Sequence, residues 1–254
     1  MKPQITFILV RPRYPGNIGS VARVIYNMGF EKLSLVEPAV LPEHPEARRL
    51  AVGAEVLLKK AKVFGTIQEA SHGMTFLVGT SRRTGKHRQD FVLLPDMPTR
   101  LPPGQKIGVL FGSEERGMTN KELAHCHLVT TIPSNPHFAS LNLAQSVGIV
   151  AYQLRLRLLE LEEGKAKKKA TRKKATDSPP ASNRMTALAS VDQVEGMYEH
   201  FEKMLGEIGF FTSNDSFHMM RTFRGLFGRT AMTEREVRIF RGLCRQVLWR
   251  LKNV

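Results

Sequence analysis

Short apolar runs alternate with amphipathic segments along the first 160 residues of the chain. The apolar runs cover residues 5–10, 33–36, 63–64, 74–79, 106–111 and 128–132. Runs of this kind are typical of strands that are buried on both faces of a parallel sheet. Segments with apolar residues at helical spacing lie at 17–28, 46–60, 67–71, 120–125 and 141–161. Strands that alternate with helices predict an α/β fold, with a parallel sheet covered by helices on both faces.

Several of these helices have recognisable ends. Asn17 is a predicted N-cap, and Gly29 is the predicted end of the same helix. Thr119 followed by Glu122 has the spacing of a capping box, in which each residue satisfies a free backbone N–H near the helix start. The same pattern begins at Thr233. These local signals set the expected helix boundaries independently of the apolar pattern.

The pattern changes abruptly after residue 163. Residues 164–181 hold seven basic side chains and a Pro–Pro pair, with almost no large apolar residue. Such a segment buries too little surface to offset its ordering entropy, so 164–184 is predicted to be a flexible basic linker. From residue 185 to 254 only helical patterns appear. The chain is therefore predicted to consist of an α/β domain at 1–163, the linker, and a small all-α domain at 185–254.

The charge of the 254-residue chain indicates a polyanionic partner. Its formal net charge is +15, of which +6 falls on residues 1–163 and +9 on the shorter remainder. A balance of this size favours nucleic acid as the partner. The two cysteines form no Cys-x-x-Cys pair, which argues against a zinc site and against a disulfide framework. The one apolar run near the start is too short to span a membrane, so we expect a cytoplasmic protein without metal or membrane.

Two familiar nucleotide-binding motifs are missing from the sequence. The first predicted strand is not followed by Gly-x-Gly-x-x-Gly. Residues 79–87 (GTSRRTGKH) have one spacer residue too many for a phosphate-binding P-loop, and His87 stands where that loop has a magnesium-binding Ser or Thr. These departures argue against a P-loop ATPase.

Three other motifs follow predicted strands. They are Asn17-x-Gly19-x-x-x-Arg23, Gly112-x-Glu114-x-x-Gly117, and Ile132-Pro133 followed by Ser140-Leu141-Asn142-Leu143. In order and spacing they resemble motifs one, two and three of the SPOUT family of RNA 2′-O-ribose methyltransferases. The segment Gly79-Thr80-Ser81 and the basic helical tail are similar to the TrmJ-type tRNA methyltransferases within that family. The resemblance is specific over residues 5–158 and weaker over the tail.

The resemblance implies a fold and an activity that composition does not show. It implies a trefoil knot at the carboxyl end of the α/β domain, S-adenosylmethionine as methyl donor, and a homodimer. The implied substrate is tRNA, methylated on a ribose of the anticodon loop, at the cytidine or uridine of nucleotide 32. Alternatives are the same reaction on ribosomal RNA, or a non-catalytic RNA-binding protein of this fold. The dimer is expected to bury either the first helix or the stripe Leu143, Val147, Val150 and Leu154.

The resemblance also implies catalytic residues, which are Arg23, Asn17, Glu114, Ser140 and Asn142. We expect Arg23 to bind a phosphate or ribose oxygen of the target and to lower the cost of losing the hydroxyl proton. A guanidinium is a poor literal base, and the alternative in which Arg23 itself takes the proton stays open. Glu114 is expected to position Arg23 or its neighbours through a charge-assisted hydrogen bond. Asn17, Ser140 and Asn142 combine helix capping with a place in the site.

The remaining site residues lie in loops after strands, where an open α/β sheet binds its ligands. Loops that hold an adenosine through backbone groups are expected to be rich in Gly and small residues. The predicted donor-binding residues are Gly79, Thr80, Ser81, Arg82, Gly112, Gly117, Ile132, Ala139, Ser140 and Leu141. The predicted RNA-binding residues are Arg23, Arg82, Arg83, Lys86, Arg88, Lys167, Lys168, Lys169, Arg172, Arg238, Arg241 and Arg245. Phosphate contacts by such residues would position an RNA without selecting its sequence. If the basic linker makes no such contacts, it is only a passive tether between the two domains.

Overall fold

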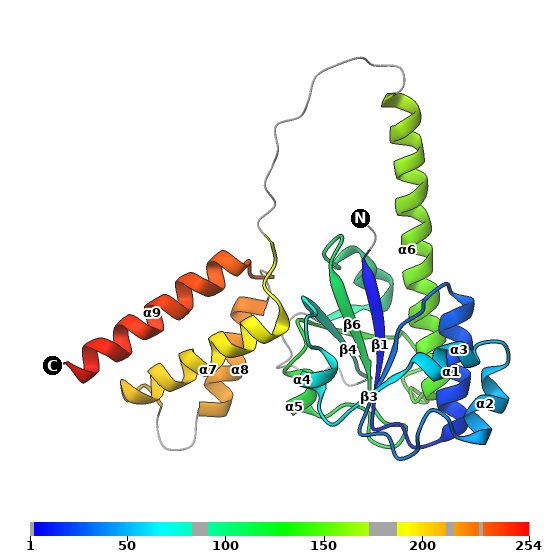
Figure 1. Ribbon diagram of the computed structural model, residues 1–254, viewed down its shortest axis with the longest axis horizontal. Helices are drawn as coiled ribbons and strands as arrows, with labels where there is room; N and C mark the ends of the chain where they lie inside the picture. Colours follow the sequence, from blue (N-terminus) through cyan, green and yellow to red (C-terminus); the bar gives the residue numbers. More distant parts are fainter. Residues whose placement is uncertain (1–2, 83–90, 173–186, 212–215, 229–230, 254) are drawn as a thin grey trace.

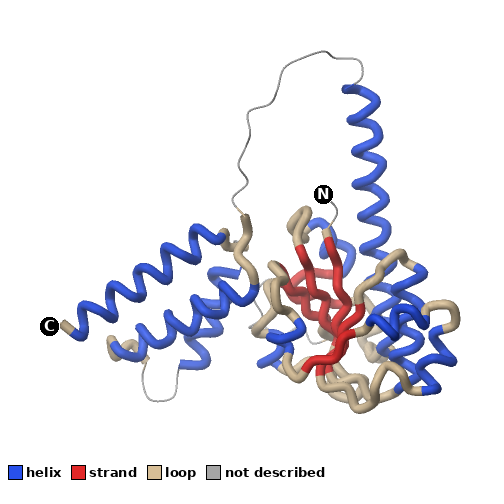
Figure 2. Tube along the Cα trace, in the orientation of Figure 1, coloured by secondary structure: helices blue, strands red, loops and turns tan. Residues whose placement is uncertain are grey.

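The structure is a computed structural model that describes residues 3–82, 91–172, 187–211, 216–228 and 231–253, with only the backbone described over 163–172. Seven parallel strands form one sheet in the order β3-β2-β1-β6-β4-β7-β5 (Figures 1 and 2). The strands are β1 (Gln4–Val10), β2 (Leu33–Val36), β3 (Lys62–Phe64), β4 (Phe76–Thr80), β5 (Phe91–Leu93), β6 (Lys106–Phe111) and β7 (Leu128–Thr131). The predicted α/β fold with a parallel sheet is confirmed.

Helices cover both faces of this sheet. One face is covered by α1 (Pro15–Asn27), α2 (Pro45–Ala51), α3 (Glu55–Lys60), the 3-10 helix η1 (Leu94–Thr99) and α6 (Leu143–Arg172). The other face is covered by α4 (Ile67–Ala70) and α5 (Asn120–Leu123). Strand β1 shows why its sequence is continuously apolar, since Phe7 and Leu9 enter the first core while Ile8 enters the second.

The closest contact between helices joins α1 to α2. A Cβ atom on Gly19 would lie 2.1 Å from the carbonyl oxygen of Ala47, so only glycine allows the two backbones to approach this closely. Gly29 has a φ of 79° and ends α1 as predicted, because this left-handed conformation carries no steric cost for glycine. Gly19 therefore sets the close packing of α1 on α2, and Gly29 sets the carboxyl end of α1.

Two elements differ from the sequence prediction. Strand β5 was not predicted, because Phe91–Leu93 is only three residues long and so short a run shows no recognisable pattern. Helix α6 runs to Arg172 rather than to residue 161. Its last turns consist mainly of Glu, Lys, Ala and Arg, which are strong helix formers even without an apolar face. The helix therefore overlaps the predicted linker over 164–172, and the trefoil knot stays a prediction.

The carboxy-terminal helices α7 (Val191–Glu207), α8 (Ser216–Gly228) and α9 (Glu234–Lys252) share a core of their own. Capping boxes begin α7 at Ser190 and α9 at Thr233, the latter as predicted. Val191 leaves this core and packs into the second core of the α/β domain, and its N–H donates to the carbonyl oxygen of Met74 at 2.6 Å. The helical unit thus docks on the face of the sheet that carries α4 and α5 (Figure 1). Among the described residues, none of the helices combines the length and the apolar character that a bilayer crossing requires.

Candidate functional site

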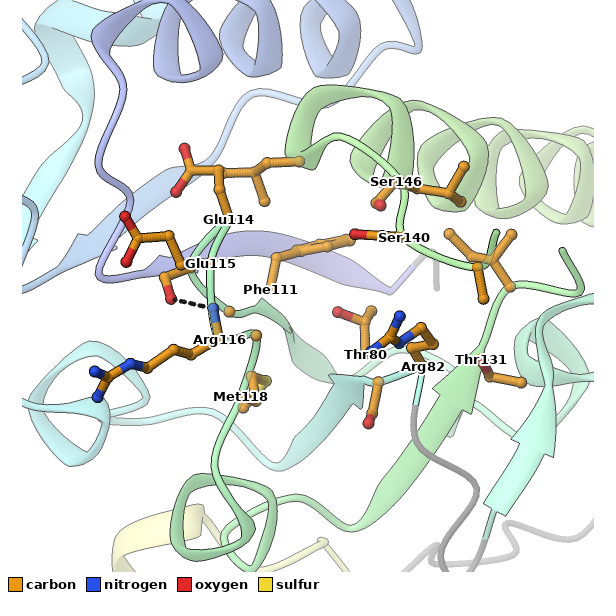
Figure 3. Close-up of a pocket in the computed structure, with 18 of the residues that line it drawn as sticks. Thr80, Arg82, Phe111, Glu114, Glu115, Arg116, Met118, Thr131, Ser140 and Ser146 are labelled. Atoms are coloured by element: carbon orange, nitrogen blue, oxygen red, sulfur yellow. Dashed lines mark hydrogen bonds between the residues drawn. The ribbon is translucent and has the colours of Figure 1, made fainter. Parts of the chain in front are cut away.

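A cleft lies at the carboxyl edge of the sheet, where β4, β6 and β7 end side by side. Its walls come from the loop after β4, the turn of residues 112–118 after β6, and the loop of residues 132–142 that leads into α6. Figure 3 shows Ser140 and Ser146 on the side of α6, Glu114 and Glu115 on the opposite turn, and Thr80 and Arg82 at the end of β4. Segments that are far apart in the sequence thus meet at the edge where parallel sheets hold ligands.

Nine of the ten predicted donor-binding residues line this cleft. They are Thr80, Ser81, Arg82, Gly112, Gly117, Ile132, Ala139, Ser140 and Leu141. Gly79 does not line it. A Cβ atom there would lie 2.6 Å from Leu123 and 2.9 Å from Cys126, so this glycine serves the packing of α5 against β4.

The turn of residues 112–118 is shaped by its two glycines. A Cβ atom on Gly112 would lie 2.1 Å from the carbonyl carbon of Gly117, and Gly117 has a φ of 64°. The N–H of Gly117 donates to the carbonyl oxygen of Ser113 at 2.8 Å, which closes the turn on itself. The spacing of the second motif is therefore a requirement of backbone geometry, and it leaves the wall of the cleft free of side chains at these two points.

A chain of hydrogen bonds joins the three motifs behind this cleft. The side-chain amide of Asn17 donates to Glu114 Oε1 at 2.8 Å, and Asn142 Nδ2 donates to Asn17 Oδ1 at 3.0 Å. Glu114 also accepts from the backbone N–H groups of Arg13 at 3.1 Å and Tyr14 at 3.4 Å. The carboxylate thus sits at the amino end of α1, where the helix dipole favours a negative charge. One residue from each motif contributes to a single fixed arrangement.

The roles of the two asparagines differ from each other. Asn17 was predicted to be an N-cap, but it is the third residue of α1 and the cap position is held by Tyr14, which makes no side-chain cap bond. The prediction failed because the partners of Asn17 are 97 and 125 positions away. Asn142 does cap α6, since its Oδ1 accepts from the N–H of Ala144 at 2.8 Å. The side-chain amide group of Asn142 is then still available to donate to Asn17 Oδ1.

Arg23 lies outside the group that forms this chain of bonds. Its side chain is exposed on α1 and does not line the cleft. That side chain makes no hydrogen bond or ion pair with any other described residue. Of the two expected roles of Glu114, the direct bond to Arg23 is absent among the described contacts, whereas Glu114 does hold other residues of the same region, namely Asn17 and the backbone N–H groups of Arg13 and Tyr14. The guanidinium of Arg23 is free to meet a group that comes from outside the chain.

The predicted RNA-binding residues are only partly described. Arg82 is exposed at the rim of the cleft. Arg83, Lys86 and Arg88 lie outside the described residues, as do the side chains of Lys167, Lys168, Lys169 and Arg172. On α9, Arg238 and Arg245 are exposed, whereas Arg241 is half-buried beside Gly196 of α7. The expected basic stripe is therefore made by two exposed arginines and one that leans towards α7.

Sequence reasoning missed several cleft residues. Phe111, Ser113, Glu115, Arg116, Met118 and Ser146 also line the cleft. Ser113, Glu115 and Arg116 occupy the unspecified positions of the second motif, and Phe111 and Met118 flank it. Ser146 had a usable signal, since it lies four residues after Asn142 and so on the same face of α6. A further missed pair joins Arg11, at the end of β1, to Glu122 of the α5 capping box.

A second cluster of ionisable side chains lies where the helical unit meets α5. Both terminal nitrogens of Arg224 donate to the carboxylate of Glu195, at 2.6 and 2.8 Å, and the guanidinium stacks on the ring of Tyr198 at 4.4 Å. Burial by itself raises the pKa of Glu195, but its neighbours His125 and Arg224 outweigh this and hold the pKa at about 2. The pair is therefore a charged contact between α7 and α8, and His125 of the α/β domain lies beside it.

The side chains of this cluster that directly follow α5 are neutral and unreactive. Burial lowers the pKa of His127 to about 4, and its Nδ1 accepts from the N–H of Leu77 at 3.1 Å, so the ring is neutral. Burial raises the pKa of the Cys126 thiol to about 12, which keeps it protonated and unreactive. The described residues contain no group of His, Cys, Asp and Glu that could hold a metal ion. This interface is structural.

Comparison with known proteins decides which family has this arrangement. The profile of the SpoU rRNA Methylase family matches residues 4–152. The chain belongs to the SpoU methylase family. The profile of the tRNA methyltransferase TrmJ C-terminal domain matches residues 192–253, so the SpoU domain is followed here by a TrmJ-type tail. The resemblance to SPOUT methyltransferases of the TrmJ type is confirmed.

Two curated members of the SpoU family resemble the whole chain. The tRNA (cytidine/uridine/adenosine-2′-O-)-methyltransferase TrmJ of Pseudomonas aeruginosa is 35% identical, over 96% of this chain and 93% of its own. The tRNA (cytidine/uridine-2′-O-)-methyltransferase TrmJ of Cronobacter sakazakii is 32% identical, over 96% and 95%. The crystal structure of TrmJ from Z. mobilis ZM4 superposes with a TM-score of 0.77 at 28% identity, covering 95% of this chain and 98% of that one. The order of both domains is thus shared with these relatives.

Proposed function

We propose that this protein transfers a methyl group from S-adenosylmethionine to a ribose 2′-hydroxyl of tRNA. The observation that carries this proposal is the chain from Glu114 through Asn17 to Asn142, which holds all three SpoU motifs around one cleft. The relatives that cover both domains carry the names of tRNA 2′-O-methyltransferases. The RNA-binding protein without catalysis is disfavoured, because such a protein would have no need for this chain of bonds.

The walls of the cleft suit the donor. Gly112 and Gly117 expose backbone, Ile132 and Leu141 offer apolar surface, and the remaining wall of Thr80, Ser81, Ala139 and Ser140 is built from small side chains. A nucleoside is bound by such a combination of flat apolar contacts and backbone polar groups. When bound, the donor would supply an electrophilic methyl group on a sulfonium. The protein's contribution would be to align the ribose hydroxyl with that methyl group, which is a large part of the rate enhancement in reactions of this kind.

We propose that Arg23 acts from one subunit of a homodimer on the cleft of the other. The stripe Leu143, Val147, Val150 and Leu154 is buried in the chain's own core, so that part of the expected dimer face is wrong. The opposite side of α6 exposes Ile149, Tyr152, Leu156 and Leu159, each between 37 and 53%. Their spacing of three and four residues makes one apolar strip, beside which α1 packs. A second copy on this strip would bring the partner subunit's Arg23 towards the RNA phosphate or ribose at the cleft.

The test is transfer of a labelled methyl group to unmodified tRNA, with ribosomal RNA as a parallel substrate. We expect incorporation into tRNA alone. Arg23→Ala should abolish transfer while donor binding, measured by calorimetry, stays within about twofold of the unsubstituted protein, since Arg23 lies outside the cleft. Lys59→Ala, which removes an exposed cation from α3, is the matched control. Equal turnover by Arg23→Ala would refute the role of this residue.

The modified nucleotide is identified in the same experiment. Digestion and mass spectrometry of the product locate the ribose methyl group, which we expect at nucleotide 32 of the anticodon loop. A solved structure with a TM-score of 0.51 and 26% identity, covering 61% of this chain and 97% of its own, is titled for 2′-OH methylation of C/U34 on tRNA. Nucleotide 34 is therefore the competing position. Substrates in which either ribose is already 2′-O-methylated separate the two.

A further inference from the structure

The outward face of α9 carries the only tryptophan of the chain. Trp249 is 58% exposed, far more than an indole needs to be in a helical bundle whose core is built from phenylalanine and methionine. The side-chain amide of Asn253 donates to the carbonyl oxygen of Trp249 at 2.7 Å and closes the last turn of α9. The indole is thus presented from a fixed helical turn near the end of α9 that lies away from the sheet (Figure 1). The described part of the chain thus leaves more than half of the indole uncovered.

The charges on α9 from its second turn onward are all of one sign. Between residues 237 and 252 the sequence has five basic residues and no acidic residue; the five are Arg238, Arg241, Arg245, Arg250 and Lys252. Arg245 lies four residues before Trp249, on the same face of the helix. The nearest acids on α9, Glu234 and Glu236, belong to its first turn. The charges on α9 itself therefore favour an anionic partner for this face.

A glycine opens the same face next to the indole. Gly242 lies in the middle of α9, three residues before Arg245 and seven before Trp249, so the three residues form one strip. Glycine inside a helix costs about 1 kcal/mol relative to alanine. Nothing lies within 4 Å of the position that a Cβ atom would take there, so packing within the chain does not require this glycine. Gly242 instead leaves the helix backbone bare at a point where a ligand could approach it closely.

Arg238 and Arg245 flank this bare position. Arg238 donates through Nε to the carbonyl oxygen of Glu234 at 3.3 Å, which steadies its side chain along the helix while the guanidinium remains exposed. Arg245 is exposed, and among the described residues it makes no ion pair. Two cations about two turns apart on one strip are too far apart along the helix to hold one compact anion together, and they suit an extended polyanion. A helix side chain also leans towards the amino end of its helix, so Trp249 leans towards Arg245.

We propose that the strip of Arg238, Gly242, Arg245 and Trp249 binds unpaired nucleotides of the RNA substrate, with a base stacked on the indole and the backbone crossing Gly242. This inference rests on the proposed function, because it takes the RNA to be the substrate of the methyltransferase cleft. It adds a recognition site that is separate from that cleft. Stacking on an aromatic side chain accepts any base, whereas arginines hold the phosphates, so the strip anchors a loop without reading its sequence.

The single tryptophan makes the site directly observable. The full-length protein is titrated with unmodified tRNA, with an oligouridine single strand and with a blunt RNA duplex, while Trp249 emission is recorded. We expect quenching by tRNA and by the single strand, and little by the duplex, because a paired base offers no free face. Binding is measured in parallel by the anisotropy of end-labelled RNA. A tRNA that binds without any change in Trp249 emission would overturn the proposal.

Substitutions separate stacking from close approach. Trp249→Ala should weaken binding of the single strand about tenfold, the usual size of one lost stacking contact, while Trp249→Phe should retain most of it. Gly242→Ala should raise the melting temperature, since alanine favours the helix, and yet weaken RNA binding. Such opposite changes in stability and in affinity would not follow from a structural role. A stabilised Gly242→Ala protein with unchanged affinity would refute the close approach.

Two controls make the outcomes decisive. Lys203→Ala removes an exposed cation from α7 of the same unit, and it should leave the anisotropy titration unchanged. Sedimentation without RNA tests whether a second copy covers the indole; self-association that Trp249→Ala abolishes would refute the assignment to RNA. Methyl transfer is measured on the same samples. No transfer by the unsubstituted protein would count against the proposed function, whereas normal transfer with a silent Trp249 would count against the strip alone.

Discussion

Replacement of Glu195 by glutamine would test what stabilises the helical unit where α7 packs against α8, next to the α/β domain. Glu195 is on the first turns of α7, next to Val191, which packs into the second core of the sheet domain. Its carboxylate is 20% exposed and receives both terminal nitrogens of Arg224. Glutamine keeps the shape of the side chain and removes the charge. Arg224 would then be a largely buried cation that keeps the ring of Tyr198 but loses its counter-ion.

Two independent arguments give the size of the effect. The pKa of Glu195 falls from its ordinary 4.5 to about 2, and at about 1.4 kcal/mol per pKa unit this is a stabilisation on the order of 3 kcal/mol. Breaking a buried ion pair by removing one partner costs about 3–5 kcal/mol in other proteins. We therefore expect Glu195→Gln to lower the free energy of unfolding of the helical unit by about 3 kcal/mol near neutral pH.

The assay is urea unfolding followed by Trp249 emission, which reports on the helical unit because the chain has no other tryptophan. Glu199→Gln, on an exposed position one turn further along α7, is the control and should change stability by less than about 0.5 kcal/mol. A carboxylate whose pKa is depressed by folding stabilises the folded state above its unfolded pKa. That contribution is lost as the pH falls from about 4.5 towards 2.

The difference between the unsubstituted protein and Glu195→Gln should accordingly shrink as the pH falls through this range. A difference that stays constant with pH, or one below about 0.5 kcal/mol at neutral pH, would mean that the ion pair does not stabilise the docked helical unit. The double substitution of Glu195 by Gln and Arg224 by Met should recover part of the loss, because it removes the unpaired cation as well.

Three further substitutions test single contacts, each by urea unfolding. Gly19→Ala should destabilise the protein by about 2 kcal/mol or more, since its Cβ would lie 2.1 Å from a carbonyl oxygen of α2; a neutral result would show that the helices separate freely. Asn142→Ala should cost about 1 kcal/mol or more through loss of the α6 cap and of the bond to Asn17, and Asn142→Asp should recover only part of it, because aspartate can cap the helix but has no N–H to donate to Asn17 Oδ1. Arg11 has a φ of 53°, so Arg11→Gly should be less destabilising than Arg11→Met by about 1 kcal/mol; the reverse order would exclude backbone strain at this residue.

The parts of the fold that the sequence predicted are those that are set locally. Strand β2 and the capping box at Thr119 depend on residues within a few positions of each other, and the structure has both where the pattern placed them. Strand β5 depends instead on pairing with residues of β7 that lie 38 positions later, and three residues carry too little pattern to reveal it. The extension of α6 to Arg172 was missed for a different reason, since charged helix formers give no apolar periodicity.

In the candidate site too, the features set by local sequence were predictable and those set by long-range contacts were not. The motifs located the three turns of the cleft because close backbone approaches at Gly112 and Gly117 restrict the residue type. Motif spacing did not reveal which polar groups pair, and it left open whether the carboxylate that Asn17 occupies binds Arg23 or its neighbours. Hydrogen-bond partners about a hundred positions apart are decided by how the sheet orders its strands. Sequence patterns of a single chain contain no information on that choice.

The contact between the two domains links the proposed RNA strip to the cleft. Helix α5 begins two residues after the turn of residues 112–118, and Glu122 of α5 binds Arg11 at the end of β1, just before the first motif. The connection from α5 to β7, which consists of Ala124, His125, Cys126 and His127, meets Glu195 and Arg224 of the helical unit. The turn that forms one wall of the cleft is therefore only one short helix away from the docked bundle. An RNA loop held on α9 would thus be presented at a fixed distance from the cleft, and the docking contact, rather than the linker, would set that distance.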